Sequence, residues 1–206
     1  SFNASSSTVY TATFTPSGGD GAKTLDVAGG VFTDSAGNNN AAATQFNWTY
    51  DTTGPSMTIT SSTVSDGATS NDSTIALTFT SSEATTNFVI GDISVSGGAL
   101  SSFSGSGTTY TATFTPSAQG ATTIDVAGGG FTDSSGNNNS AATQFNWTFD
   151  TVVPSMAITS STVSDGATSN NSTLAMIFTS NEATTNFVIG DISVSGGALS
   201  SFSGSG

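Results

Sequence analysis

A long internal repeat constrains this chain more than any other feature of its 206 residues. Residues 51–102 align with residues 150–201 without a gap and differ at only 8 of 52 positions. The stretch Tyr10–Phe14 likewise returns letter for letter as Tyr110–Phe114, and the period is about 100 residues. A unit of this length is far too long for a solenoid repeat, and it suits a whole small domain in a tandem array.

Within each repeat, short stretches alternate apolar and polar residues with a period of two. This period puts apolar side chains on one face of a strand and Thr, Ser or Asn on the other, as in half-buried antiparallel sheets. Turn formers such as Asp66-Gly67 separate the stretches. We predict an all-β protein in which about seven strands per repeat form an antiparallel β-sandwich without disulfide bonds. In the second repeat the clearest stretches are 57–60, 74–80, 93–95, 110–114, 124–126 and 145–149.

Two prolines mark the expected domain starts. Pro55 and Pro154 each follow a linker that begins with Asp-Thr, and each precedes the first strand of a repeat. We therefore expect one complete domain at 54–150, the C-terminal half of a preceding repeat with its linker at 1–53, and the N-terminal half of a following repeat at 151–206. Neither half can cover its apolar face alone, because half a sandwich leaves open edges and an uncovered face.

Two explanations of the half-repeats are open. The sequence is a window on a longer tandem protein, or the C-terminal half of one chain is completed by the N-terminal half of another copy in a head-to-tail fibre. The window is favoured because residues 201–206 duplicate part of the opening segment instead of dividing the domain cleanly. Either way, the expected partners are neighbouring copies of the same repeat.

Charge and composition exclude several classes of function. The chain has 14 Asp and Glu against one Lys or Arg, and its formal net charge is −13. Nucleic acids and anionic membranes bind basic clusters, so neither is an expected partner. Without His or Cys there is no Ser-His-Asp triad, no thiolate nucleophile and no ordinary zinc site. We predict that the protein is not an enzyme. No apolar run reaches the roughly 18–20 residues of a membrane span.

Several motifs occur in an order that resembles a known family. Ser82-Glu83-Ala84 is followed by GDISVSGG at 91–98, YTATFTP at 110–116 and TDSSGN at 132–137. In combination these motifs are similar to the bacterial Ig-like domains of large secreted adhesins and surface proteins, and the resemblance covers essentially the whole chain. It implies tandem Ig-like sandwiches with an extracellular or cell-surface location and an architectural role.

The resemblance also implies a candidate calcium site, because related adhesin arrays hold calcium between domains. In an Ig-like sandwich the linker into the domain, the loop after the second strand and the last hairpin loop share one end. Hard oxygen ligands there suit Ca²⁺, which takes about six to eight of them. The alternative is ordinary turn carboxylates, since Asp favours turns. The candidate ligands are Asp51, Glu83, Asp92, Asp133 and Asn137 of the complete domain, Asp150, Glu182 and Asp191 of the next repeat, and Asp34 of the first half-domain.

Asn-X-Ser/Thr sequons are a second candidate feature, as acceptors of N-linked glycans. Asn47 and Asn146 fall on the polar face of the final strand, and Asn71 and Asn170 lie in a loop of successive repeats. In a chain so rich in Ser, Thr and Asn, several sequons occur by chance. Glycosylation is therefore a hypothesis, which an intact mass above the sequence mass would support.

Together these observations predict a structural role as a rod, stalk or fibre segment of a repetitive extracellular protein. Near-identical repeats favour a spacer, because a recognition surface normally diverges from its neighbours. The alternative is a carbohydrate- or surface-binding adhesion module. Trp48 and Trp147 alternate in phase with aromatic neighbours, which favours core packing over a sugar-stacking platform. A Lys–Asn isopeptide bond is excluded in the complete domain, because the sole lysine, Lys23, corresponds to Thr122 there.

Overall fold

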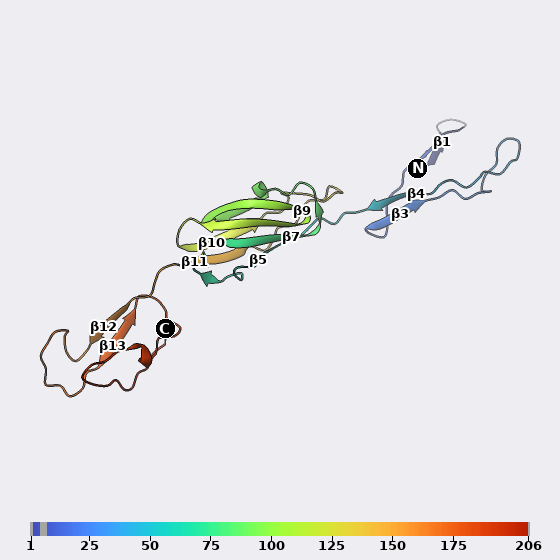
Figure 1. Ribbon diagram of the computed structural model, residues 1–206. Helices are drawn as coiled ribbons and strands as arrows, with labels where there is room; N and C mark the ends of the chain where they lie inside the picture. Colours follow the sequence, from blue (N-terminus) through green and yellow to red (C-terminus); the bar gives the residue numbers. More distant parts are fainter. Residues whose placement is uncertain (1, 5–7, 206) are drawn as a thin grey trace. The chain divides into compact units, whose positions relative to one another are not determined.

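The computed structural model describes residues 2–4 and 8–205 of the chain. It divides into two units, Ser1–Asp150 (unit 1) and Thr151–Gly206 (unit 2), which are described separately. The described regular structure consists of β-strands and two single 3₁₀ turns at Ile90–Asp92 and Ile189–Asp191, as Figure 1 shows. The described residues contain no helix that is long and apolar enough to span a membrane.

Residues 51–150 of unit 1 form a complete β-sandwich with two sheets. The first sheet has the order β5-β7-β9, and the second has the order β6-β11-β10-β8. The strands are β5 (Met57–Ser61), β6 (Thr69–Ser70), β7 (Ile75–Thr85), β8 (Ile93–Ser96), β9 (Gly98–Pro116), β10 (Gly120–Val126) and β11 (Phe145–Phe149). Every stretch that alternates in the sequence overlaps one of these strands, so the predicted all-β sandwich is confirmed.

One pairing departs from the predicted antiparallel pattern. β6 pairs with β11 in parallel, with Thr69 opposite Thr148. The reason is topological. β6 lies in the connection between β5 and β7, two strands of the first sheet, but it pairs at the edge of the second sheet. All other strand pairs of the sandwich are antiparallel.

Alternating burial along the strands builds the core. In β7, Ile75, Leu77 and Phe79 are buried, while Ala76 and Thr80 between and after them are exposed. Each such apolar side chain contributes roughly 1.5–3 kcal/mol when it is removed from water. Phe88 connects the aromatic part of the core, with ring centroids 5.0 Å from Tyr110 and 4.9 Å from Phe131. The least exposed large side chains are Trp147, Phe79, Phe114, Phe131, Ile75, Leu77, Ile124 and Val126.

The half-repeat at the start of the chain, here called the leading half-repeat and described at 2–4 and 8–50, forms two separate two-stranded sheets. These are β1 (Phe2–Ala4) with β2 (Tyr10–Ala12), and β3 (Gly21–Leu25) with β4 (Phe46–Tyr50). Their apolar side chains stay largely exposed: Phe14 is 46% exposed and Phe46 is 65% exposed. The prediction that this half-repeat cannot cover its own apolar face is confirmed.

Unit 2 contains two strands, β12 (Met156–Ser160) and β13 (Met176–Ser180), paired antiparallel. The N-terminal half of a repeat would supply four strands by analogy with β5 to β8, but among the described residues of unit 2 only the counterparts of β5 and β7 are strands. Residues 168–169 and 192–195 correspond to β6 and β8, which in the complete domain pair with β11 and β10. The sequence of unit 2 has no counterpart of β10 or β11, so these residues have no strand of their own unit to pair with.

Candidate metal centre

Three carboxylates of the complete domain meet at one end of the sandwich. Asp51 lies in the linker before β5, Glu83 lies near the end of β7, and Asp133 lies in the connection from β10 to β11. One oxygen atom of each lies within 4.8 Å of those of the other two. The isolated bridge between Thr85 and Asp133 holds that connection against the end of β7. Three segments far apart in sequence therefore place negative charge in one small volume.

The Asp133 carboxylate organises its own loop. Its Oδ1 accepts hydrogen bonds from the backbone N–H groups of Ser135 (2.8 Å) and Asn137 (2.9 Å), and its Oδ2 accepts one from Asn137 Nδ2 (2.9 Å). Gly136 takes the left-handed conformation with φ of 90°, which glycine adopts without steric cost. The motif TDSSGN thus folds as an Asp-capped turn, which is the ordinary turn chemistry expected of Asp.

The linker into the domain is fastened to this loop. Ser135 Oγ donates to Asp51 Oδ2 at 2.8 Å, and Asn137 Nδ2 donates to the Asp51 carbonyl at 3.3 Å. Gly54 lies so close to this loop that a Cβ atom at position 54 would come within 2.0 Å of the Asn138 carbonyl oxygen. The corresponding residue in the next repeat is Val153. The linker after Asp150 therefore cannot dock in the same way.

Electrostatics distinguish the carboxylates of the cluster. Burial, followed by the negative charges of Asp51, Asp133 and Asp20, raises the pKa of Glu83 above its ordinary value. Burial also raises the pKa of Asp133, but the hydrogen bonds from Asn137, Ser135 and Gly136 together outweigh it and leave that pKa lowered. Glu83 is thus the member whose negative charge is least compensated by its surroundings, and a cation would relieve it most.

A fourth carboxylate, Asp20, approaches this end from the leading half-repeat. It accepts hydrogen bonds from the hydroxyl groups of Thr52 (2.7 Å) and Thr53 (2.6 Å) and from the Thr52 N–H (3.0 Å). The hydrogen bond from Thr53 is the largest cause of its lowered pKa. Sequence reasoning missed Asp20, because its counterpart in the complete domain is Gln119 and no motif marks it.

The remaining candidate ligands lie elsewhere. Asp92 Oδ2 accepts the Val89 N–H (2.8 Å), and Asp191 Oδ2 accepts the Val188 N–H (2.9 Å) in the equivalent 3₁₀ turn. Asp34 caps its own turn through Asn38. The Asp150 N–H donates to the Ser70 carbonyl, at the end opposite Asp51. Among the described residues only Asp51, Glu83 and Asp133 form a cluster of metal-ligating side chains; Asp150, Glu182, Asp191 and Asp34 are not brought together.

The sequon asparagines are all accessible. Asn47, Asn71, Asn146 and Asn170 are exposed, so the hypothesis of N-linked glycans stays a prediction. Trp147, opposite Asn146, is 1% exposed, and its Nε1 donates to Ser70 Oγ at 3.0 Å. Core packing of Trp147 is therefore confirmed over a sugar-stacking role.

Asn139 is a structural residue that the sequence reading did not single out. It is 4% exposed, accepts the Phe131 N–H, and donates to the carbonyls of Ala127 and Ser140. We expect Asn139→Ala to lower the free energy of unfolding by about 2–4 kcal/mol, because it strands buried backbone groups. Urea denaturation measures this. Asn40→Ala removes the same contacts from an exposed loop and should cost far less; equal losses would contradict the prediction.

The two-sheet fold of residues 51–150 is that of an Ig-like β-sandwich domain. Residues 51–149 match the model of a family described as "Bacterial Ig-like domain". Domains of this family are typically modules of extracellular and cell-surface proteins, and the family is not one of enzymes. Neither the comparison with curated proteins nor the comparison with solved structures found a match.

Proposed function

We propose that this chain is a load-bearing spacer, a rod or stalk segment of a repetitive extracellular protein. The observation that supports it is the position of the two linkers of the complete domain. Asp51 enters beside Glu83 at the end of β7, whereas Asp150 leaves beside Ser70, near the start of β7. A chain that enters and leaves a sandwich at opposite ends adds the full strand length with each repeat. For the 11 residues of β7 this length is about 35 Å.

The composition of the surface supports the same role. A net charge of −13 with a single basic residue makes neighbouring rods repel each other and stay soluble.

The alternative, an adhesion module, needs a concave site of about 300–1,000 Å³ for a small ligand. A hollow in the complete domain, lined by Met57, Ile59 and Phe145, measures about 100 Å³. One of about 580 Å³ in unit 2 is lined by Ile158 and Met176, whose counterparts Ile59 and Leu77 belong to the core of the complete domain. The spacer is therefore the better-supported function.

Small-angle scattering tests the spacer. One further copy of residues 51–149 would be inserted after Phe149, and the maximum dimension of the longer chain compared with that of the original. We expect an increase of about 35–45 Å per inserted copy. No increase, or a compact profile for the longer chain, would overturn the proposal. Tryptophan fluorescence of a Trp48→Phe chain across a glycan panel is the control for the adhesion alternative, since buried Trp147 should not respond.

A second candidate function is stiffening by calcium at the domain junction, supported by the cluster of Asp51, Glu83 and Asp133. All three supply hard oxygen ligands, and Asp51 Oδ2 and Asp133 Oδ2, which accept one hydrogen bond each, keep a second lone pair. Ca²⁺ held there would tie the linker before β5 to β7 and to the Asp133 loop. Calorimetric titration of Ca²⁺ into the chelator-treated protein, with Mg²⁺ as the comparison, tests this proposal. If no binding heat is measured, the calcium proposal is overturned, and these carboxylates serve only to hold the turn and the linker.

A further inference from the structure

Residues 51–54, here called the first linker, are fastened on both sides. The strand pair β3–β4 has Gly21 opposite Tyr50, so Asp20 lies directly beside the start of the first linker. Residues 133–140 of the complete domain, here called the receiving loop, meet the linker from the other side. A segment of four residues that is bound by both of its neighbours has little freedom to act as a hinge.

On the side of the leading half-repeat, one carboxylate holds two successive residues of the first linker. Asp20 Oδ1 accepts hydrogen bonds from the backbone N–H and the hydroxyl group of Thr52, and Asp20 Oδ2 accepts one from the hydroxyl group of Thr53. Hydrogen bonds to a charged acceptor are roughly twice as strong as those between neutral groups. Because both carboxylate oxygens are used, Asp20 fixes the direction in which the chain leaves β4.

On the side of the complete domain, the receiving loop holds the backbone of the linker. Asn137 Nδ2 donates to the Thr53 carbonyl at 3.5 Å. The Ser140 N–H donates to the Pro55 carbonyl, directly after the linker, at 2.9 Å. Gly54 fits against the loop because it has no Cβ atom. The linker therefore enters the complete domain in one defined position.

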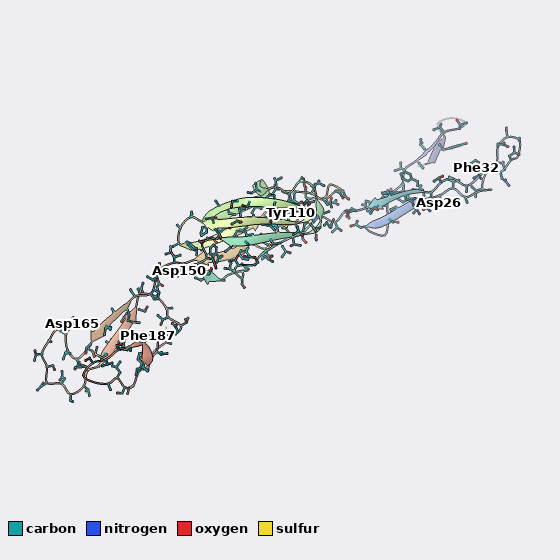
Figure 2. The ribbon with its side chains drawn as sticks, viewed as in Figure 1. Asp26, Phe32, Tyr110, Asp150, Asp165 and Phe187 are labelled. Atoms are coloured by element: carbon teal, nitrogen blue, oxygen red, sulfur yellow. The ribbon has the colours of Figure 1, made fainter. Side chains whose placement is uncertain are left out.

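Residues 150–153, the second linker, lack groups that fasten the first; Figure 2 labels Asp150 at its start. Val152 stands in place of Thr53 and has no hydroxyl group to donate. Val153 stands in place of Gly54 and carries the Cβ atom that the receiving loop excludes at that position. These are two of only 8 differences over 52 aligned positions. The variation between the repeats is therefore concentrated at the linker.

The acceptor of the hydrogen bonds changes together with the donor. Gln119 directly precedes β10, as Asp20 directly precedes β3, and each lies beside the linker that follows the paired strand. The Gln119 side chain is uncharged and has one acceptor oxygen, whereas a carboxylate has two. Asp20 and Thr53 thus form a matched pair, and both members are replaced at the second linker.

We propose that the first linker is a stiff joint, locked by Asp20 on one side and by the receiving loop on the other. The array then contains joints of two kinds, stiff where this set of residues is present and looser where it is replaced. This inference adds to the spacer function by assigning where the rod resists bending. The lock consists of hydrogen bonds and steric fit, so it operates with or without bound Ca²⁺.

The lengthened chain, with a further copy of residues 51–149 after Phe149, provides the first test. It joins two complete domains through a first linker that faces Gln119, and Gln119→Asp in the preceding copy rebuilds the lock. Thr80→Cys in each copy, at an exposed position of β7, carries a spin label in a chain without other cysteines. Pulsed electron paramagnetic resonance in chelator then measures the distribution of distances between the two labels.

We expect the distribution of the Gln119→Asp chain to be about half as broad as that of a chain with Gln119, Thr53→Val and Gly54→Val. The reason is that a free linker of four residues spans roughly 10 Å with a wide spread. Ala118→Asp, which adds the same charge one residue earlier, is the matched control and should not narrow the distribution. Equal widths in all chains would overturn the stiff joint, while the increase in length seen by scattering would leave the spacer standing.

The second test uses the original chain and measures amide hydrogen exchange of Thr52, whose N–H donates to Asp20. Asp20→Ala should speed this exchange about tenfold. Asp26, labelled in Figure 2, accepts a hydrogen bond from Gln45 in the same half-repeat, so Asp26→Ala is the control and should leave the exchange of Thr52 unchanged. Exchange that is already fast in the original chain, or equally accelerated by both substitutions, would overturn the proposal.

Discussion

Replacing Phe114 with alanine should nearly unfold the complete domain, whereas replacing Phe14 should leave it almost unchanged. Phe114 is 0% exposed and meets the Trp147 ring edge to face at 6.2 Å. Removing a buried Phe costs about 3–5 kcal/mol in lost burial and residual cavity, against a usual domain stability of about 5–15 kcal/mol. Phe14 has the same neighbours in sequence but is 46% exposed, so its removal empties no closed space.

Urea denaturation followed by tryptophan fluorescence measures this contrast. A Trp48→Phe background leaves Trp147 as the sole tryptophan reporter. We expect the midpoint to fall by about 1–3 M for Phe114→Ala and to stay within error for Phe14→Ala. A comparable loss from both substitutions would mean that the core of the complete domain depends on the leading half-repeat, contrary to the exposure of its apolar side chains.

The second large effect is expected from Glu83→Gln. This substitution should raise the melting temperature in chelator and lower it, relative to the wild type, in calcium. In chelator at neutral pH, Glu83→Gln should raise the melting temperature, because it removes a charge that Asp51, Asp133 and Asp20 repel. In calcium the wild-type chain should gain about 2.7 kcal/mol at a hundredfold excess over Kd, or roughly 10 °C for a domain of this size. The variant should lose most of that gain.

Differential scanning calorimetry of both chains in both buffers makes the measurement. Glu182→Gln is the matched control: it changes the counterpart residue in unit 2, where the described residues form no carboxylate cluster, and should alter neither curve. A Glu83→Gln chain that responds to calcium as the wild type does would contradict the site. The gain in chelator tests the electrostatic argument separately, since it does not involve the metal.

The pH dependence has a definite sign. Glu83 has a folded-state pKa above its ordinary value of 4.5, so its protonated form favours the folded state. Its contribution to stability is fully present below the unfolded pKa and is lost as pH rises through the raised folded pKa. The advantage of Glu83→Gln in chelator should therefore disappear on acidification below about pH 4.5. Asp133, whose pKa is lowered, acts in reverse and loses its contribution as pH falls.

Much of the fold could be predicted because it depends on local alternation. The period-two pattern of residues 74–80 fixes which side chains face inward, and β7 buries Ile75, Leu77 and Phe79 accordingly. The parallel pairing of β6 with β11 could not be predicted in this way. So short a strand has no period to read, and its partner is the last strand of the domain, far along the chain.

The candidate metal site likewise has features that could be predicted from the sequence and features that could not. Turn chemistry is local, so the sequence offered a turn carboxylate as the alternative role of Asp133, and it placed Asp51 in a linker. The sequence also placed Glu83 and Asp92 at this end of the domain. That Glu83 meets Asp51 and Asp133, while Asp92 turns back to cap its own 3₁₀ turn, depends on where β7 ends relative to the loop. Asp20 could not be found at all, because its contact with Thr52 and Thr53 depends on how the leading half-repeat meets the linker.

By itself, the sequence determined the repeat, the all-β class, and the exclusion of basic, thiol and histidine chemistry. These properties depend on composition and on short-range periodicity. The tertiary structure decided which of the candidate carboxylates share one volume, since Asp51, Glu83 and Asp133 meet and Asp92 does not, and how far each apolar side chain is exposed. Both are long-range properties: Phe114 and Phe14 sit in the same local sequence, and only the presence of the other half of the sandwich buries one and exposes the other.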